Sequence, residues 1–271
     1  MLGRKQSLSD QRTWEAAYRN AATLVQTAAF EDLLAQTVSQ IRQTCQGKHV
    51  AFGWSGGKDS LVLQEVMALA GYTECVLVLT YLEYRAFLQW VTDHMPPDLT
   101  VLRTRHDLCW LRDHPHMLFP QTASTAAQWF HQVQHQGQQD YVRARKIDFL
   151  AVGRRRLDGN YCGRDGLYTN RAGITRYAPL VSWTHEEVFA ALHYFGRTLP
   201  PCYGWPRGYQ VGTGPWAARQ WTCSLREAFD EVWQIDPEVV LEAARMLPSA
   251  AGYLAVRDME ALCADSLVLS G

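Results

Sequence analysis

The sequence lacks the patterns that mark metal-finger, disulfide-bonded and membrane-spanning proteins. Its 7 cysteines include no Cys-x-x-Cys pair, and no histidine stands at metal-finger spacing from a cysteine. No stretch reaches the roughly 20 apolar residues of a membrane span, and the first residues, MLGRKQSLSD, lack the apolar core of a signal peptide. We therefore expect a cytoplasmic protein with no membrane partner, no zinc site, no disulfide framework and no iron-sulfur cluster.

The chain also lacks an excess of charge of either sign. Lys and Arg number 26 and Asp and Glu number 27, which gives a formal net charge of -1 at pH 7. No global field therefore draws the molecule toward nucleic acid or an anionic membrane, and the sequence does not require a nucleic-acid partner. Any recognition of an anion must come from local clusters of basic residues.

The composition is that of a folded globular protein. Apolar residues make up 47% and charged residues 20% of 271 residues, far from the composition of disordered chains. The length suits one substantial α/β domain, or a core domain with an appended piece. Most of the 10 tryptophans are expected in the core or in pocket walls, because aromatic rings usually supply buried area.

Short apolar runs alternate with segments of helical spacing, which is the pattern of an α/β fold. The alternation predicts a mainly parallel sheet with right-handed crossovers, and hence a Rossmann-like three-layer α/β/α sandwich. Polar residues 125–145 predict a helix in which Gly137 is a candidate break. Residues 153–175 and the Gly/Pro-rich residues 200–215 predict loops. The predicted buried strands are His49–Trp54, Cys75–Thr80, Leu99–Arg103 and Phe149–Val152, and the helices after the first two are Leu61–Ala70 and Tyr84–His94.

Both ends of the chain are expected to be helical. Residues 8–45 carry apolar positions at helical spacing and predict two helices before the first strand. The N-terminal helices are candidates for packing on a second copy of the chain, so a homo-oligomer is a partner to consider. The expected division is a helical extension at 1–47, a nucleotide-binding domain at 48–215 and a second helical extension at 216–271.

One short string carries the strongest chemical information. It follows a predicted buried strand and precedes a predicted helix, and its adjacent glycines let the backbone approach an anion at the positive end of that helix. Its lysine can neutralise phosphate charge, its serines offer hydroxyl donors, and its aspartate can hold Mg²⁺ directly or through water. The string differs from the common NTPase loop and from Gly-x-Gly-x-x-Gly. We predict a phosphate-binding loop formed by Ser55, Gly56, Gly57, Lys58, Asp59 and Ser60.

This string resembles the signature of the PP-loop superfamily, also called adenine nucleotide alpha hydrolases. The superfamily includes ATP pyrophosphatases and phosphoadenosine phosphosulfate (PAPS) reductases. Three further elements resemble the branch of PAPS reductases and ATP sulfurylase small subunits, and together with the loop they cover roughly residues 48–215. They are Thr80–Glu83 after the second strand, Val152–Arg156, which is similar to a Gly-x-Arg-Arg element, and Pro179–Phe189, which is similar to a Pro-Leu-x-x-Trp-Thr-x-x-Asp-Val-Trp element.

The resemblance implies an enzyme that binds ATP or PAPS with Mg²⁺, and it implies roles for particular residues. The residues expected to be catalytic are Lys58, Asp59 and Arg155, and Asp59 is expected to bind the Mg²⁺ ion. Further positive charge is offered by Arg164, Arg171 and Arg176, which share the segment after the fourth strand. Nucleotide contacts are expected from the whole loop of residues 55–60 and from Glu83, Gly153, Arg154 and Arg156.

The sequence departs from PAPS reductases at two places. Those enzymes carry a Glu-Cys-Gly-x-His segment near the C-terminus, whereas this chain has Cys263 within Ala-Leu-Cys-Ala-Asp. Leu79 also stands where the family has an aspartate. The loop is therefore expected to serve a different acceptor.

Three functions remain open from the sequence. The leading hypothesis is a transferase that splits ATP between its α- and β-phosphates, adenylates an unidentified acceptor and releases pyrophosphate. The alternative is a sulfur enzyme that reduces PAPS or adenylyl sulfate with Cys263 or another thiol. The third is a non-catalytic nucleotide-binding module.

Overall fold

The apolar runs of the sequence form one six-stranded sheet with the order β3-β2-β1-β4-β6-β5. All neighbouring strands are parallel except the β5–β6 pair, which is antiparallel. The side chains of β1 and β4 are almost wholly buried, as expected for central strands that are covered on both faces. The strands are β1 (Val50–Gly53), β2 (Cys75–Leu79), β3 (Leu99–Arg103), β4 (Phe149–Ala151), β5 (Leu167–Thr169) and β6 (Thr175–Tyr177).

The computed structural model describes residues 2, 8–159, 161–220 and 222–268, with residues 8, 9 and 261–268 described by their backbone only. The chain divides into two compact units. The first contains Met1–Leu79, Ala86–Arg103 and Gln134–Thr213, and the second contains Thr80–Arg85, Thr104–Val133 and Gly214–Gly271. These units follow spatial contacts and each joins several segments of the chain. The division into three consecutive ranges stays a prediction.

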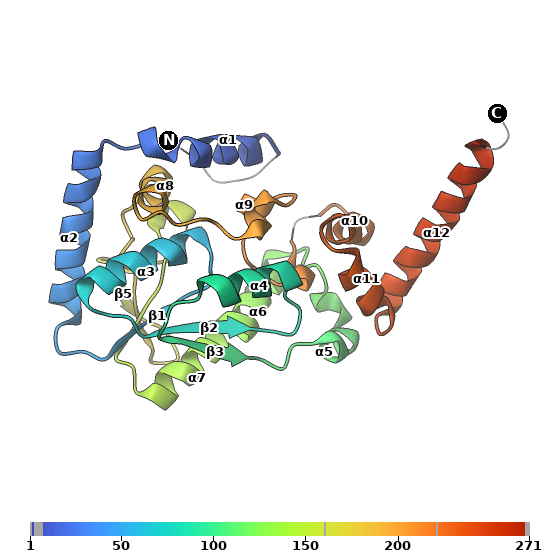
Figure 1. The fold of residues 1–271 in the computed structure, drawn as a ribbon. Coiled ribbons are helices and arrows are strands. Elements are labelled where there is room, and N and C mark those ends of the chain that lie inside the picture. The colour runs from blue at the N-terminus through green and yellow to red at the C-terminus, as the bar shows by residue number, and fades with distance from the viewer. Residues whose placement is uncertain (1, 3–7, 160, 221, 269–271) are drawn as a thin grey trace. The chain divides into compact units, whose positions relative to one another are not determined.

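Helices cover both faces of the sheet in the first unit (Figure 1). Helices α3 and α4 lie over one face, and α7 lies over the other. Helices α2 and α8 pack against α3. The predicted α/β class with a mainly parallel sheet is therefore confirmed. The α-helices of this unit are α1 (Leu8–Arg19), α2 (Thr27–Cys45), α3 (Lys58–Ala70), α4 (Arg85–His94), α7 (Gln136–Arg145), α8 (His185–Tyr194) and α9 (Gly208–Val211).

The second unit is helical. Helix α10 begins at Ser224, whose hydroxyl accepts a hydrogen bond from the Glu227 amide at 3.1 Å, and Asp236 caps the next helix in the same way. A core of apolar residues joins these helices, including Phe229, Val232 and Val240. The helices are α5 (Leu108–Asp113), α6 (Ala123–Trp129), α10 (Leu225–Ile235), α11 (Pro237–Ala244) and α12 (Pro248–Val268).

No single helix of the described residues is long and apolar enough to cross a membrane. Two consecutive helical segments, Pro237–Ala244 and Pro248–Glu260, reach that length and composition only together, and they are bent by 119°.

The structure corrects two details of the predicted loops. Residues 153–175 contain β5 and the start of β6, which form an antiparallel hairpin at the sheet edge. The predicted loop at 200–215 contains the 3-10 turn Pro201–Gly204 and the short helix α9. Each of these strands, turns and helices is only three or four residues long, so the sequence shows no periodicity that could reveal it.

Gly137 does not break its helix, contrary to the expectation. A π-helical turn at Phe130–His135 precedes α7, and Gly137 lies within α7. A Cβ atom on Gly137 would lie 2.6 Å from Cγ1 of Val78 on β2. The glycine therefore lets α7 approach the sheet closely.

Replacing Gly137 with alanine should destabilise the protein. The new methyl group forces Val78 or the helix to move, so we expect the free energy of unfolding to fall by about 1–3 kcal/mol. Gly252→Ala is the matched control, because Gly252 lies in α12 with no atom within 4 Å of the added Cβ. The same change there should raise the free energy of unfolding by roughly 0.5–1 kcal/mol through helix propensity. Urea denaturation measures both, and equal effects of the two changes would contradict this explanation.

Candidate functional site

The turn between β1 and α3 contains two adjacent glycines in different surroundings. Gly56 has a φ of +68°, and a Cβ there would lie 2.9 Å from Cζ3 of Trp90. A Cβ on Gly57 would lie 3.3 Å from the hydroxyl oxygen of Tyr203. Local geometry therefore requires glycine at position 56, because its positive φ strains any other residue and Trp90 fills the adjacent space. At position 57 a side chain would be tight against Tyr203.

The two serines of the loop hold its shape. The Ser60 hydroxyl donates to the Gly57 carbonyl at 2.9 Å and accepts from the Ser55 amide at 3.1 Å. The Ser55 hydroxyl donates to Ser60 Oγ at 3.2 Å and accepts from the Gly57 amide at 3.3 Å. Such bonds from hydroxyls to nearby backbone fix a turn that regular secondary structure does not fix.

The three residues predicted to be catalytic are in direct contact. Lys58 Nζ lies 2.8 and 2.6 Å from the two carboxylate oxygens of Asp59. Arg155 Nε lies 3.1 Å from Asp59 Oδ1, and its Nη2 donates to Asp158 Oδ1 at 3.1 Å. The Arg155 side chain is fully buried, and its Nη2 also lies 2.8 Å from Nδ1 of His185. Two cations and two carboxylates thus form one compact network.

The position of Lys58 differs from that of an exposed phosphate-binding lysine. Its side chain is 5% exposed, and burial is the main cause that lowers its pKa below the ordinary lysine value. Asp59 opposes that shift, and Arg155 adds to it. The Lys58 ammonium therefore acts first on Asp59.

Asp59 does not fit a direct magnesium ligand in this arrangement. Both of its oxygens are already paired with Lys58, and one is also paired with Arg155. Two neighbouring positive charges oppose the approach of a divalent cation. Within the part of the chain that the structure describes, no group of three or more His, Cys, Asp or Glu residues is placed to hold a metal ion. The assignment of Mg²⁺ to Asp59 stays a prediction, and no chemical step is derived through a metal.

Tyr203 reaches the start of α3 from a distant part of the chain. Its buried hydroxyl accepts a hydrogen bond from the Lys58 amide at 2.9 Å, across 145 residues of sequence. Burial raises the pKa of this hydroxyl well above its ordinary value, so it stays protonated. The Tyr203 ring contacts the Tyr209 ring, with centroids 5.2 Å apart. One of the amides at the helix N-terminus is therefore occupied by a side chain.

A cavity of about 210 Å³ opens beside the loop in the first unit. It lies beyond the carboxyl ends of β1, β2 and β4, where parallel sheets usually bind ligands. Apolar strand residues form one part of its wall. Polar residues come from the loop, from α7 and the π-helical turn before it, from the segment after β4 and from β6. The lining residues are Gly53, Trp54, Ser55, Asp59, Ser60, Leu77, Val78, Gln134, His135, Gln138, Val152, Gly153, Arg154 and Arg176.

The structure places the three consecutive arginines in three different environments. Arg154 lines the cavity, where Nη1 donates to the Tyr168 hydroxyl at 2.9 Å. Arg155 is buried in the network with Asp59. Arg156 is exposed, and its Nη2 donates to the Arg164 carbonyl oxygen. Only Arg154 of the three faces the cavity, so the nucleotide contact predicted for Arg156 stays a prediction.

Gly153 joins the segment after β4 to the start of α3. A Cβ at this position would lie 3.1 Å from the carbonyl carbon, the oxygen and the Cβ of Asp59. The absence of a side chain therefore allows the two loops to touch beside the cavity.

Polar residues that sequence reasoning missed complete the cavity. Gln134, His135 and Gln138 lie at the start of α7 and in the π-helical turn before it. Oε1 of Gln138 is buried without a hydrogen-bond partner. The sequence of this segment reads as an ordinary polar helix, so nothing in it distinguishes these three residues.

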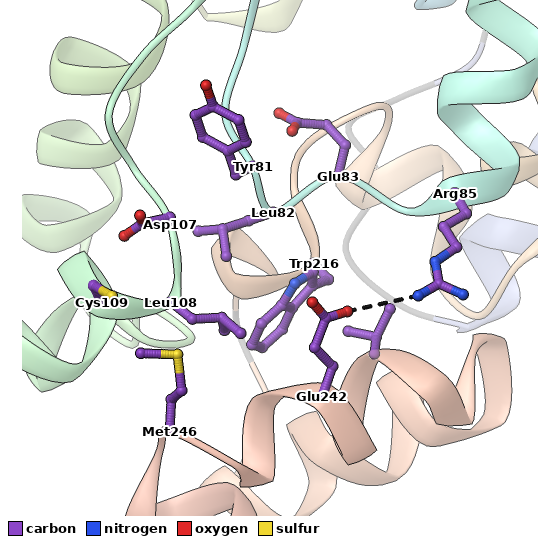
Figure 2. Close-up of a pocket in the computed structure, with 11 residues that line it drawn as sticks. Tyr81, Leu82, Glu83, Arg85, Asp107, Leu108, Cys109, Trp216, Glu242 and Met246 are labelled. Atoms are coloured by element: carbon purple, nitrogen blue, oxygen red, sulfur yellow. Dashed lines mark ion pairs between the residues drawn. The ribbon is translucent and has the colours of Figure 1, made fainter.

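Glu83 lies in the second unit, where it shapes the turn after β2. Its Oε1 accepts from the Thr80 amide at 2.7 Å and from the Thr80 hydroxyl at 2.9 Å. A second cavity, of about 300 Å³, lies within this unit, and Figure 2 shows Glu83 in its wall with Arg85 and Glu242, which form an ion pair at 3.7 Å. A nucleotide contact from Glu83 stays a prediction.

The cysteines give no sign of a shared sulfur site. The six whose side chains the structure describes are thiols, and four of them, including Cys162 and Cys202, are buried. Burial raises the pKa of Cys162, which disfavours the reactive thiolate. The side chain of Cys263, the predicted nucleophile of the sulfur hypothesis, lies outside the described residues.

Replacing Tyr203 with phenylalanine tests the contact at the helix start. The Lys58 amide loses its acceptor while still buried, so the free energy of unfolding should fall by about 1–3 kcal/mol. Tyr72→Phe is the matched control, because the Tyr72 hydroxyl donates to the Cys45 carbonyl oxygen, which can take another donor. Loss of the Tyr72 hydrogen bond should lower the free energy of unfolding by about 0.5–1.5 kcal/mol. Urea denaturation at neutral pH checks both, and a Tyr203→Phe protein as stable as the native one would refute the contact.

No family model matches the chain, and no curated protein matches it. Among solved structures it is similar to the PAPS reductase from Candida auris, at 14% identity and a TM-score of 0.49, over 79% of this chain and 98% of that chain. It is similar to the NAD+ synthetase from Burkholderia pseudomallei, at 14% identity and a TM-score of 0.47, over 97% and 100% of the two chains. It is also similar to the FMN adenylyltransferase from Candida glabrata, at 12% identity and a TM-score of 0.45, over 76% and 73%. A PAPS reductase, one of the enzyme classes that the glycine loop resembles, is thus among the solved structures to which this chain is similar.

Proposed function

We propose that the cavity beside the glycine loop binds an adenine nucleotide, and that the protein splits ATP between its α- and β-phosphates. One observation carries this proposal. The glycine loop follows β1 and the Gly153 segment follows β4, and these adjacent strands are the point where the strand order reverses direction. In open parallel sheets, that point is where nucleotides bind.

The phosphate end of the nucleotide belongs at the start of α3. This helix has 13 residues, and its N-terminal amides carry a partial positive charge that favours an anion. The Ser55 and Ser60 side chains line the same part of the cavity. The network of Lys58, Asp59, Arg155 and Asp158 is neutral overall, so it holds the loop in place while the helix amides and hydroxyls receive the phosphates.

The nucleoside end belongs against the sheet. Leu77, Val78 and Val152 provide an apolar surface at the strand ends. The unpartnered Oε1 of Gln138 is an acceptor that an amino group of a base or a ribose hydroxyl can satisfy. The cavity is smaller than the roughly 300–1,000 Å³ of most ligand sites, so we expect the nucleotide to extend beyond it.

The reaction that suits this arrangement is transfer of the adenylyl group. An oxygen of the acceptor attacks the α-phosphorus and forms a new P–O bond, the bond to the bridging oxygen breaks, and pyrophosphate leaves with that electron pair. The protein contributes by holding the groups in line and by stabilising the charge that grows on the leaving pyrophosphate. Backbone amides fixed at a helix N-terminus are suited to the second task. The Ser55 and Ser60 hydroxyls would first have to release the hydrogen bonds that they donate to Ser60 Oγ and to the Gly57 carbonyl.

A ligand screen separates this function from the two alternatives. Thermal unfolding should be shifted most by ATP, since a ligand at 100 times its dissociation constant stabilises by about 2.7 kcal/mol. A larger shift with PAPS or adenylyl sulfate, together with release of sulfite, would instead support a sulfur enzyme. Binding of ATP with no AMP or pyrophosphate formed from any acceptor would support a non-catalytic module.

Lys58→Met should reduce pyrophosphate release by about 10²–10³-fold, because Asp59 and the start of α3 lose the cation that holds them. Lys48→Met is the control, since Lys48 is exposed and lies outside the network; it should leave the rate unchanged. Ser55→Ala leaves the ion network intact and should also lower the rate, which separates loss of the loop from loss of the fold. If a pyrophosphate assay shows unchanged turnover in both Lys58→Met and Ser55→Ala, the proposal is wrong.

A further inference from the structure

Three arginines are buried in the described part of the chain, and one of them differs from the other two. Arg155 pairs with Asp59 and Asp158, and Arg219 pairs with Glu231 at 2.9 Å. Arg176 is 3% exposed, and the described residues place no carboxylate within ion-pair distance of it. Its Nη2 atom is buried without a hydrogen-bond partner.

The positive charge of Arg154 adds to the cost of burying Arg176. Arg154 lines the same cavity, and burial together with the charge of Arg154 lowers the pKa of Arg176. Arg154 itself is bonded to neutral groups, the Tyr168 hydroxyl at 2.9 Å and His135 Nε2 at 3.0 Å. A buried charge without a counter-ion is costly, and two like charges in one cavity cost more.

We propose that Arg154 and Arg176 form a second anion subsite, which binds the carboxylate of the acceptor. A bound carboxylate would compensate both charges and would satisfy Nη2 of Arg176. Guanidinium groups suit this task because their planar forks match carboxylate oxygens. The identification of the anion as the acceptor rests on the proposed adenylyl transfer.

The strand order separates this subsite from the glycine loop within the same cavity. Arg154 follows β4, and Arg176 lies in the middle of β6, where it pairs in register with Leu150 of β4 and Tyr168 of β5. The loop follows β1, on the other side of β4. One end of the cavity thus offers helix amides and the other offers guanidinium groups.

This placement defines the chemical class of the acceptor as a carboxylic acid. One carboxylate oxygen attacks the α-phosphorus of ATP, the bond between that phosphorus and the bridging oxygen breaks, and the electron pair leaves with pyrophosphate. The products are an acyl adenylate and pyrophosphate, and no oxidant or reductant is needed.

The first test uses thermal unfolding in a zwitterionic buffer of low ionic strength, with benzoate as the probe. Arg176→Met removes the uncompensated charge, so its unfolding midpoint should rise by about 2–4 °C without benzoate and should no longer respond to benzoate. Arg219→Met is the matched control; it leaves Glu231 buried and unpaired, so its midpoint should fall while its response to benzoate is kept. Arg154→Gln, on a half-buried side chain, should weaken benzoate binding at least about tenfold, the value of a single charge-assisted bond. Native-like benzoate binding in the Arg154 and Arg176 variants would overturn the subsite.

The second test identifies the source of the anion by titrating benzoate calorimetrically into protein saturated with AMPCPP, an ATP analogue that cannot be split between the α- and β-phosphates. If the subsite holds the acceptor, benzoate still binds and Arg176→Met leaves the affinity for AMPCPP within about twofold. The opposite result is that AMPCPP abolishes benzoate binding and that Arg176→Met lowers the affinity for AMPCPP as much as the affinity for benzoate. In that case the two arginines hold a nucleotide phosphate, and the acceptor assignment is wrong. If AMPCPP does not bind but benzoate binding still depends on Arg176, adenylyl transfer fails as the function while the anion subsite stands.

Discussion

The carboxylate of Asp59, held between Lys58 and Arg155, is the interaction on which the site depends. It ties the first turn of α3 to the segment that follows β4, and so it joins the two loops that border the cavity. Gly153 lets these loops meet, because even one methyl group there would press on Asp59 at 3.1 Å. Loss of this carboxylate would leave a buried guanidinium without one of its two partners, which is among the costlier changes a protein interior can undergo.

The distribution of charge around the cavity follows from that network. The cations that a phosphate site would normally use, Lys58 and Arg155, are already paired with carboxylates, so a phosphate at the glycine loop would be held mainly by backbone amides. The uncompensated positive charge lies instead at Arg154 and Arg176, on the far side of β4. A site with these two ends fits a reaction between a nucleotide and an anionic acceptor better than it fits binding of a nucleotide alone.

Much of the fold could be predicted from the sequence, whereas the partners of most site residues could not. Continuous apolar runs revealed β1 and β2, and the glycine pair before a helical segment revealed the loop, because these signals are local. The contact of Tyr203 with Lys58 joins residues 145 positions apart, and no local pattern announces it. The three consecutive arginines looked alike in sequence, yet their surroundings differ because each is set by residues distant in the chain, such as His185 for Arg155. The β5–β6 hairpin was missed since its strands have three residues each and β5 is largely exposed.

The most direct test of the central claim is a crystal structure of the protein with AMPCPP bound. We predict that the β- and γ-phosphates lie at the N-terminus of α3, within hydrogen-bond distance of the backbone of residues 56–59 and of the Ser55 or Ser60 hydroxyl. The nucleoside should lie against Leu77 and Val152, with the Arg154 and Arg176 guanidinium groups left for a second anion. A nucleotide bound away from the glycine loop, or one whose phosphates lie on Arg154 and Arg176 while the loop amides contact none of them, would contradict the claim.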